Sequence, residues 1–292
     1  MRAFGSAWLI PEKQKGAQLQ LLNKGKKLIS ILCASPYRRA LWKGVAAAVE
    51  HGALLRTLRC NTVVDIGANR GQFALVAHHC FPDAAIFSFE PLPGAAQVFR
   101  RVLGNERLVR LQQHAIGPSA ATCDMHVSNR DDSSSLFPIG ELHAQIFPGT
   151  AECRRQAVRV ERLDSILSAT DIRPCALLKI DVEGYEIEAL KGCGDLLDLF
   201  TYLYLEVSFV QLNDGQPLAD EVIEYLRRRE FQFKGVFNVS YDKRGYSVQA
   251  DFLFTNTKFM SAPRSAQLAP DLAYFARQAG ACGLSGSCKS AS

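Results

Sequence analysis

The chain has 292 residues, of which 48% are apolar and 22% charged, and its formal net charge is +5. This composition is typical of a globular protein with a large core and excludes collagen-like and intrinsically disordered chains. No run approaches the roughly 18 to 20 uninterrupted apolar residues of a membrane-spanning helix, and Pro11 and Glu12 interrupt the short apolar patch near the start. We therefore expect a cytoplasmic protein whose nine cysteines, which include no Cys-x-x-Cys pair, are reduced and mostly buried.

Residues 13–58 are expected to form two helices separated by Pro36. The first combines Leu19, Leu22 and Leu28 with several lysines, a pattern shared by helices that lie on membrane surfaces and by helices packed on a domain. Peripheral membrane contact through this helix therefore stays open as an alternative. The positive charge forms no long basic tract, so a nucleic acid partner is not expected.

From residue 61, short strand-like runs alternate with helical stretches, which is typical of a parallel sheet covered on both faces. The expected strands are 62–66, 84–89, 107–116, 175–180 and 199–208, and the expected helices are 71–80, 92–104, 163–169, 184–191 and 217–229. Two more runs, 231–237 and 248–254, are expected to add a hairpin-like pair. The sequence thus predicts a doubly wound, mostly parallel α/β sheet of seven strands with an N-terminal helical extension.

Two segments break this alternation. Residues 129–150 are rich in Ser, Asp, Pro and Gly and are expected to form a long loop, of the kind that often covers a site. Beyond residue 262 the chain has no sustained apolar period, and at most one helix near 268–278 is expected. The predicted organisation is an extension at 1–59, a main domain at 60–258 and a partly disordered tail at 259–292.

The strongest local motif follows the first expected strand, where Asp65, Gly67, Ala68, Asn69 and Gly71 form a D-x-G-A-N-x-G turn before a helix. Two glycines let a backbone approach a ligand closely, and doubly wound sheets bind ligands where strand order reverses. The spacing does not match the dinucleotide fingerprint G-x-G-x-x-G. A glycine turn shaped only by packing is the alternative.

A second motif, Phe89-Glu90-Pro91, ends the next expected strand about 20 residues beyond the glycine turn. Nucleotide-binding α/β folds hold ribose hydroxyls with a carboxylate at this place. The register of Glu90 with the first motif favours that role over a solvated strand end.

A third motif, Lys179-Ile180-Asp181-Val182-Glu183-Gly184-Tyr185-Glu186, ends an apolar strand with several charges. Such charges at the end of a central strand are costly unless they face a ligand or one another. The alternative to a ligand site is an ion pair between Lys179 and Glu183 that braces the sheet.

Together with Leu163-Asp164-Ser165 and the serines at 133–135, these motifs resemble the FkbM family of methyltransferases over roughly residues 60–255. The resemblance implies a class I methyltransferase fold, S-adenosylmethionine as cofactor, and methylation of a hydroxyl of a small molecule or sugar. It implies a cofactor site made of Asp65, Gly67, Ala68, Asn69, Gly71, Glu90, Pro91, Ala115, Ile116 and Asp181. Ala74 departs from the family, which often has Ser or Thr there, so a hydroxyl contact at that position is not expected.

An alcohol is almost wholly protonated near neutral pH, so methyl transfer to it calls for a general base. The candidates are Asp181 and Glu183, followed by Glu206 at the end of the next strand. His114, His126 and His143 are weaker alternatives. The three carboxylates could also gather Mg²⁺, but carboxylates are common at strand ends and no zinc spacing occurs, so no metal is expected.

Two rival functions remain at this point. An NAD-binding oxidoreductase has the same fold class, although the missing middle glycine argues against it. A non-catalytic module that binds a membrane or partner through its basic helix is the second rival. The acceptor and the oligomeric state are not predicted.

Overall fold

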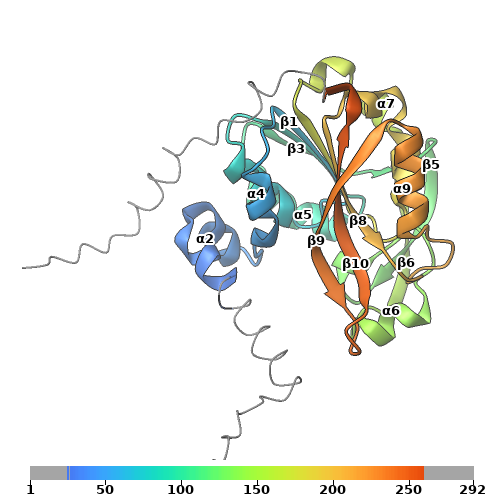
Figure 1. Cartoon of the computed structure of the whole chain (residues 1–292). Helices are drawn as coiled ribbons and strands as arrows, with labels where there is room; N and C mark the ends of the chain where they lie inside the picture. The colour runs from blue at the N-terminus through green and yellow to red at the C-terminus, as the bar shows by residue number, and fades with distance from the viewer. Residues whose placement is uncertain (1–24, 26, 260–292) are drawn as a thin grey trace, which may run out of the picture.

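The computed structural model describes residue 25 and residues 27–259. Its centre is a seven-stranded sheet in the order β3-β2-β1-β7-β8-β10-β9 (Figure 1). The strands are β1 (Thr62–Ile66), β2 (Ala85–Phe89), β3 (Val109–Gln112), β7 (Ala176–Ile180), β8 (Tyr202–Ser208), β9 (Phe231–Tyr241) and β10 (Ser247–Asn256). The first five are parallel, and β10 runs antiparallel to both β8 and β9. The predicted fold class, including the final hairpin, is confirmed.

The order of the strands reverses between β1 and β7. The chain runs outward from β1 through β2 to β3 and later returns to place β7 on the other side of β1. In doubly wound sheets such a switch point leaves a crevice beyond the carboxyl ends of the two strands. The motifs at Gly67 and Asp181 directly follow these two ends.

Two apolar cores cover the two faces of the sheet. Leu177 and Leu178 are adjacent in β7 and fully buried, and alternation along the strand sends them to opposite faces. Leu178 packs on the side of α8 (Glu186–Gly192) and α9 (Ala219–Arg228), whereas Leu177 packs on the side of α4 (Gln72–Cys80) and α5 (Pro93–Leu103). Burial on both faces explains why these strands are continuous apolar runs.

The N-terminal extension packs on α4. Residues 27–33 are helical, followed by α2 (Ser35–Trp42), the 3₁₀ turn η1 (Val49–His51) and the short α3 (Gly52–Leu55). As predicted, Pro36 marks the boundary between two helices: the first ends at residue 33, and Pro36 lies in the first turn of α2, where a missing N–H is tolerated. The second predicted helix does not continue to residue 58, because α2 ends at Trp42 and the separate η1 and α3 follow. Most of the first predicted helix lies outside the described residues, as does the one expected near 268–278.

A second, three-stranded sheet was not predicted. It contains β4 (Ala115–Ile116), β6 (Glu152–Glu161) and β5 (Ala121–Ser128), in that order. The run expected as one strand at 107–116 is therefore two strands in different sheets. The expected loop at 129–150 contains η2 (Asp131–Ser133) and α6 (Glu141–Ile146), and α7 (Leu163–Ile166) follows β6. Long stretches of β5 and β6 are exposed, so their sequences lack a clear apolar alternation.

The seven cysteines among the described residues form no disulfide, but the expectation that they are mostly buried is wrong. Of these seven, only Cys193 is buried, whereas Cys33, Cys153 and Cys175 are exposed. In this described part of the chain, no helix combines the length and apolar character needed to cross a bilayer.

Candidate functional site

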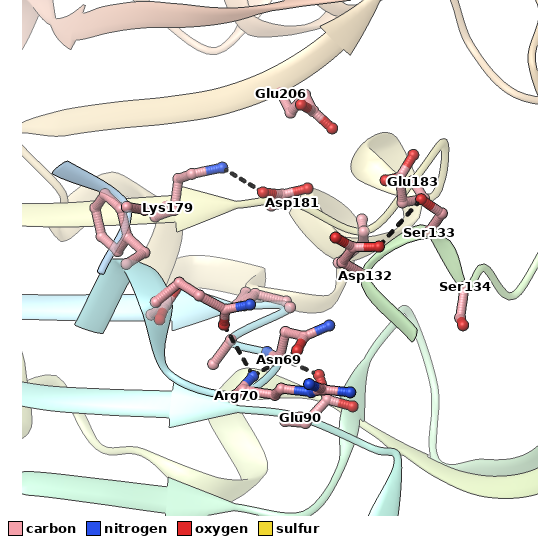
Figure 2. Close-up of a pocket in the computed structure, with 18 of the residues that line it drawn as sticks. Asn69, Arg70, Glu90, Asp132, Ser133, Ser134, Lys179, Asp181, Glu183 and Glu206 are labelled. Atoms are coloured by element: carbon pink, nitrogen blue, oxygen red, sulfur yellow. Dashed lines mark hydrogen bonds and ion pairs between the residues drawn. The ribbon is translucent and has the colours of Figure 1, made fainter. Parts of the chain in front are cut away.

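A cavity of about 600 Å³ opens beyond the carboxyl ends of β1, β2, β7 and β8. This volume is typical of a pocket for a small molecule. Of the site residues predicted from the sequence, it brings together Asp65, Gly67, Ala68, Asn69, Glu90, Pro91, Ala115, Ile116, Asp181, Glu183 and Glu206. Figure 2 shows Asn69 and Glu90 on one side of this space, with Asp181 and Glu206 across from them.

The loop after β1 depends on Gly67, whose φ is +85°. A Cβ on this residue would lie 1.8 Å from the backbone oxygen of Asp181, so the β1 and β7 loops touch where only glycine fits. Gly71 does not line the cavity. It is the N-cap residue of α4, with a φ of +92°, and a Cβ there would meet Leu103 and Phe99 of α5. Its glycine is thus required by helix packing.

Glu90 ties the ends of β1 and β2 together. Its side chain is buried, and its two carboxylate oxygens accept the backbone N–H groups of Asn69 at 2.9 Å and Leu92 at 2.7 Å. These bonds hold the carboxylate against the cavity wall (Figure 2). Since a carboxylate can accept more than two hydrogen bonds, Glu90 is suited to bind the hydroxyls of a ribose.

Asp65 adds a second polar group to the cavity wall. The residue is buried, and its Oδ2 has no hydrogen-bond partner among the described residues. Burial raises the pKa of this carboxyl to about 7, although Lys179 opposes the shift. Buried polar atoms are rarely left without a partner, so a polar ligand fits this wall.

Lys179 lies in a row of polar side chains across the sheet. In the strand register it sits between Asp65 in β1 and Tyr204 in β8. Its ammonium is buried, 3.1 Å from Oδ2 of Asp181 and 3.6 Å from Oδ1 of Asp251. Burial lowers the pKa of Lys179, but the two carboxylates outweigh it and raise the pKa above its usual value. The ion pair of Lys179 is therefore with Asp181 and Asp251, not with Glu183.

Three carboxylates gather at the ends of β7 and β8. Asp181, Glu183 and Glu206 each offer an oxygen within 4.8 Å of the others. Burial, and next the charge of Asp181, raise the pKa values of Glu183 and Glu206 well above their usual value. Protonated and ionised carboxyls side by side can both donate to and accept from hydroxyl groups. The expectation that no metal binds here stays a prediction.

Glu183 is held in an unusual backbone conformation. Its φ is +50°, which is uncommon for a residue with a side chain. Ser135 and Asn213 both donate to its backbone oxygen, at 2.7 Å and 2.6 Å. Ser135 thereby connects the 129–150 segment to the end of β7. Several residues of this segment line the cavity, which fits its predicted role of covering a site.

Several cavity residues were not expected from the sequence. They are Glu50 and His51 from the extension, and Asn238, Ser240, Gln249 and Asp251 from the β9–β10 hairpin. Asp251 could have been noticed in the sequence, because it is a charged residue within an otherwise apolar strand. Of the predicted histidines, His114 and His143 line the cavity, whereas His126 pairs with Glu152 at 2.7 Å on the second sheet.

The fold and this crevice define a Rossmann-like α/β protein with a ligand-sized crevice at the β1–β7 switch point. The sequence profile of the methyltransferase FkbM domain matches residues 65–233. The chain belongs to the FkbM methyltransferase family.

Several named methyltransferases are similar in sequence. The 2-O-methyltransferase NoeI of Sinorhizobium fredii is 28% identical over 202 residues, which cover 67% of this chain and 79% of that protein. The 31-O-demethyl-FK506 methyltransferase FkbM of Streptomyces tacrolimicus is 25% identical over 63% of this chain and 76% of its own. Methyltransferase sdnD of Sordaria araneosa is 33% identical over 46% of this chain and 60% of its own.

Solved structures are more distant. An rRNA methylase from Streptococcus thermophilus aligns with a TM-score of 0.40 and 12% identity, covering 70% of this chain and 93% of that one. The magnesium protoporphyrin IX methyltransferase of Synechocystis PCC 6803 aligns with a TM-score of 0.38 and 11% identity, covering 79% of this chain and 82% of that one.

As a member of this family, the protein is a methyltransferase that uses S-adenosylmethionine. The family match decides against the oxidoreductase and the non-catalytic module. Bound S-adenosylmethionine supplies a methyl group on a sulfonium. The wall fits it, since Glu90 is suited to the ribose, Ala115 and Ile116 offer an apolar border, and Asp65 presents a buried carboxylate oxygen that has no partner among the described residues.

Proposed function

We propose that this protein transfers the methyl group of S-adenosylmethionine to a hydroxyl of a polyhydroxylated small molecule, with a sugar as the favoured acceptor. The observation that carries the proposal is the polar wall opposite the cofactor side of the cavity. There the clustered carboxyls of Asp181, Glu183 and Glu206 are joined by Gln249, which donates to Glu206 at 2.9 Å. Carboxylates and amides are suited to bind several hydroxyls at once.

The names of two relatives support hydroxyl methylation. NoeI is a 2-O-methyltransferase, and the protein from Streptomyces tacrolimicus acts on 31-O-demethyl-FK506. The acidic wall supports an uncharged or cationic acceptor, because these half-buried acidic side chains would repel a phosphate or carboxylate placed beside them. The same repulsion argues against a nucleic acid acceptor.

The chemistry depends mainly on placement. Displacement at a sulfonium develops little charge for the protein to stabilise, so aligning the acceptor oxygen with the methyl carbon supplies much of the acceleration. We propose that Asp65, Gly67, Ala68, Asn69, Glu90, Pro91, Ala115 and Ile116 hold the cofactor. Asp181, Glu183 and Glu206 then bind and orient the acceptor hydroxyls.

The test uses the full chain and S-adenosylmethionine labelled in its methyl group. Methyl glycosides of neutral hexoses, amino sugars, simple aliphatic alcohols and sugar phosphates are offered separately, and the methylated position is assigned by NMR. We expect label on an oxygen of neutral or amino glycosides and much less on sugar phosphates. Transfer only to phosphorylated sugars, or to nitrogen or carbon, would contradict the proposal. The Glu90→Ala variant serves as the cofactor-deficient control.

A further inference from the structure

His51 lies in the cavity wall, and the Nδ1 edge of its ring is held by three neighbouring polar side chains. It ends η1, and its side chain is only 12% exposed. Its Nδ1 lies 3.1 Å from the hydroxyl of Tyr204, 3.1 Å from the amide nitrogen of Asn238 and 3.4 Å from Oδ2 of Asp251. Phe73 contacts the ring edge-on, with 5.3 Å between ring centroids. These contacts leave the ring little freedom to rotate.

The hydrogen bonds around Asp251 indicate where the proton on His51 lies. Tyr204 donates its hydroxyl hydrogen to Oδ2 of Asp251 at 3.0 Å, and Asn238 donates to the same oxygen at 2.8 Å. The hydroxyl oxygen of Tyr204 is then an acceptor, and together with the carboxylate of Asp251 it favours a proton on Nδ1 of His51. Among the described residues, Nε2 has no hydrogen-bond partner, and in the tautomer with the proton on Nδ1 it carries the lone pair.

We propose that His51 is the general base that takes the proton of the acceptor hydroxyl, and that Asp251 is the positioning residue that fixes its ring and tautomer. This inference rests on the proposed function. In the step, the acceptor oxygen forms a bond to the methyl carbon, and the sulfur–carbon bond breaks with its electron pair moving to sulfur. The hydroxyl proton passes to Nε2, so the positive charge of the sulfonium reappears on the imidazolium.

The charges around His51 suit this role. Burial lowers its pKa, and Lys179 lowers it too, whereas Asp251, Glu50 and Asp181 raise it. The net lowering leaves a neutral ring at physiological pH, which is the form that accepts a proton. The imidazolium formed in the step is then balanced by the carboxylate of Asp251, and Tyr204 is the neutral group between them.

The carboxyls of the acceptor wall are less suited to take the proton. Asp181 already accepts a hydrogen bond from the ammonium of Lys179 at 3.1 Å, so one of its oxygens is engaged within the protein. The pKa values of Glu183 and Glu206 are raised by burial and by Asp181, so these side chains retain protons to higher pH and can serve as hydroxyl ligands. His51 and Asp251 both lie outside residues 65–233, so the family match does not assign them a role.

The first measurement needs no acceptor. Two-dimensional NMR of the full chain, labelled with ¹⁵N in histidine and saturated with S-adenosylhomocysteine, reports the tautomer of each ring, and loss of one signal in His51→Gln assigns it. We expect a neutral ring at pH 7 with the proton on Nδ1, and a change of tautomer in Asp251→Asn. A proton on Nε2, as a hydrogen bond from Asn238 to Nδ1 would produce, overturns the proposal.

The second measurement uses a glycoside that the wild-type chain methylates. We expect His51→Gln to lower kcat by about 10²- to 10⁴-fold and to abolish the acidic limb of the pH profile, because general-base catalysis contributes about that much. Imidazole added to His51→Ala should restore part of the rate, whereas it should not affect His79→Gln, a variant of an exposed histidine that does not line the cavity. Calorimetry with S-adenosylhomocysteine verifies that each variant is folded.

Two failures are distinguishable. If wild-type methylates a glycoside and His51→Gln does so at a similar rate, the base is another residue and only the inference falls. If the wild-type chain methylates no glycoside, the proposed function fails, and the role of His51, which depends on it, fails with it whatever the tautomer.

Discussion

The side-chain amide of Asn213 donates a hydrogen bond to the backbone oxygen of Glu183, with 2.6 Å between the two atoms. Ser135, which precedes β7 in the sequence whereas Asn213 follows it, donates to the same oxygen at 2.7 Å. Two segments far from β7 in sequence therefore hold the turn that carries Glu183 into the cavity. This arrangement stabilises a positive φ that the residue would otherwise rarely adopt.

We expect Asn213→Ala to lower the free energy of unfolding by about 1–3 kcal/mol, because Asn213 is buried and the partly buried oxygen of Glu183 loses one of its two donors. Turnover should fall as well, since the carboxylate of Glu183 loses its fixed position, while affinity for S-adenosylhomocysteine changes little. Urea unfolding, calorimetry and methyl transfer to a glycoside measure the three quantities. Asn105→Ala, at an exposed position, is the control and should remain within about 0.5 kcal/mol of wild-type. Equal effects of the two variants would show that the hydrogen bond from Asn213 to Glu183 contributes nothing to stability or turnover.

A second prediction concerns the contact between the β1 and β7 loops. In Gly67→Ala the new Cβ would lie 1.8 Å from the backbone oxygen of Asp181, so one of the two loops must move. We expect loss of cofactor binding and a fall in the free energy of unfolding larger than the ~1 kcal/mol that a positive φ alone costs.

Gly215 supplies the matched control for this variant. Its φ is +81°, close to the +85° of Gly67, but a Cβ there meets nothing within 4 Å. Gly215→Ala should therefore show only the cost of the backbone conformation, with cofactor affinity unchanged. Thermal unfolding and calorimetry separate the two variants. If they lose equal stability and both retain cofactor affinity, the close contact at Gly67 is not required.

The third prediction concerns Glu90. Glu90→Gln leaves only one oxygen to accept the N–H groups of Asn69 and Leu92, and it places an amide where a hydroxyl acceptor is needed. We expect calorimetry to show a 10- to 100-fold weaker Kd for S-adenosylhomocysteine, the equivalent of about 1.4 to 2.8 kcal/mol. Glu106→Gln removes an exposed carboxylate that pairs with His78 at 3.3 Å, away from the cavity, and should leave the Kd unchanged. An unchanged Kd in Glu90→Gln would remove this residue from the cofactor site.

The central sheet could be predicted because its strands are short, apolar and interrupted by glycine or proline. Leu177 and Leu178 both face a core, so the β7 run reads as a fully buried strand. The second sheet could not be predicted this way, since much of β5 and β6 is exposed and their order depends on contacts with β4. Pairing between distant strands leaves no local pattern.

The same distinction divides the site. The proposed cofactor side is built from strand-end motifs, so Asp65, Asn69 and Glu90 could be named from these motifs and the family resemblance that they carry. On the acceptor side, His51 and Asp251 meet only because the N-terminal extension packs beside β10, and no spacing in the sequence joins them. Asp251 alone was detectable, as a charged residue inside an apolar run.

The last prediction concerns the pH dependence of stability and rests on Glu186 at the start of α8. Its side chain is buried and accepts the backbone N–H of Gly184 at 2.8 Å. Burial raises the pKa of this carboxyl from 4.5 to about 7, and the backbone hydrogen bonds oppose the shift only in part. Between these values the unfolded chain has released the proton and the folded chain has kept it. Because the folded state binds more protons, the free energy of unfolding falls as pH rises through this window.

Glu186→Gln keeps the size and the acceptor oxygen of the side chain but cannot ionise. We expect its free energy of unfolding to fall less than that of wild-type between pH 4.5 and 7, by at most about 3 kcal/mol at roughly 1.4 kcal/mol per pH unit. Asp65, whose pKa is also raised to about 7, adds a slope of the same sign that the variant retains. Urea unfolding at half-unit pH steps measures both curves, and the exposed Glu141→Gln should follow wild-type. Parallel curves for Glu186→Gln and wild-type would mean that Glu186 is ionised in the folded protein throughout, with the Gly184 bond outweighing burial.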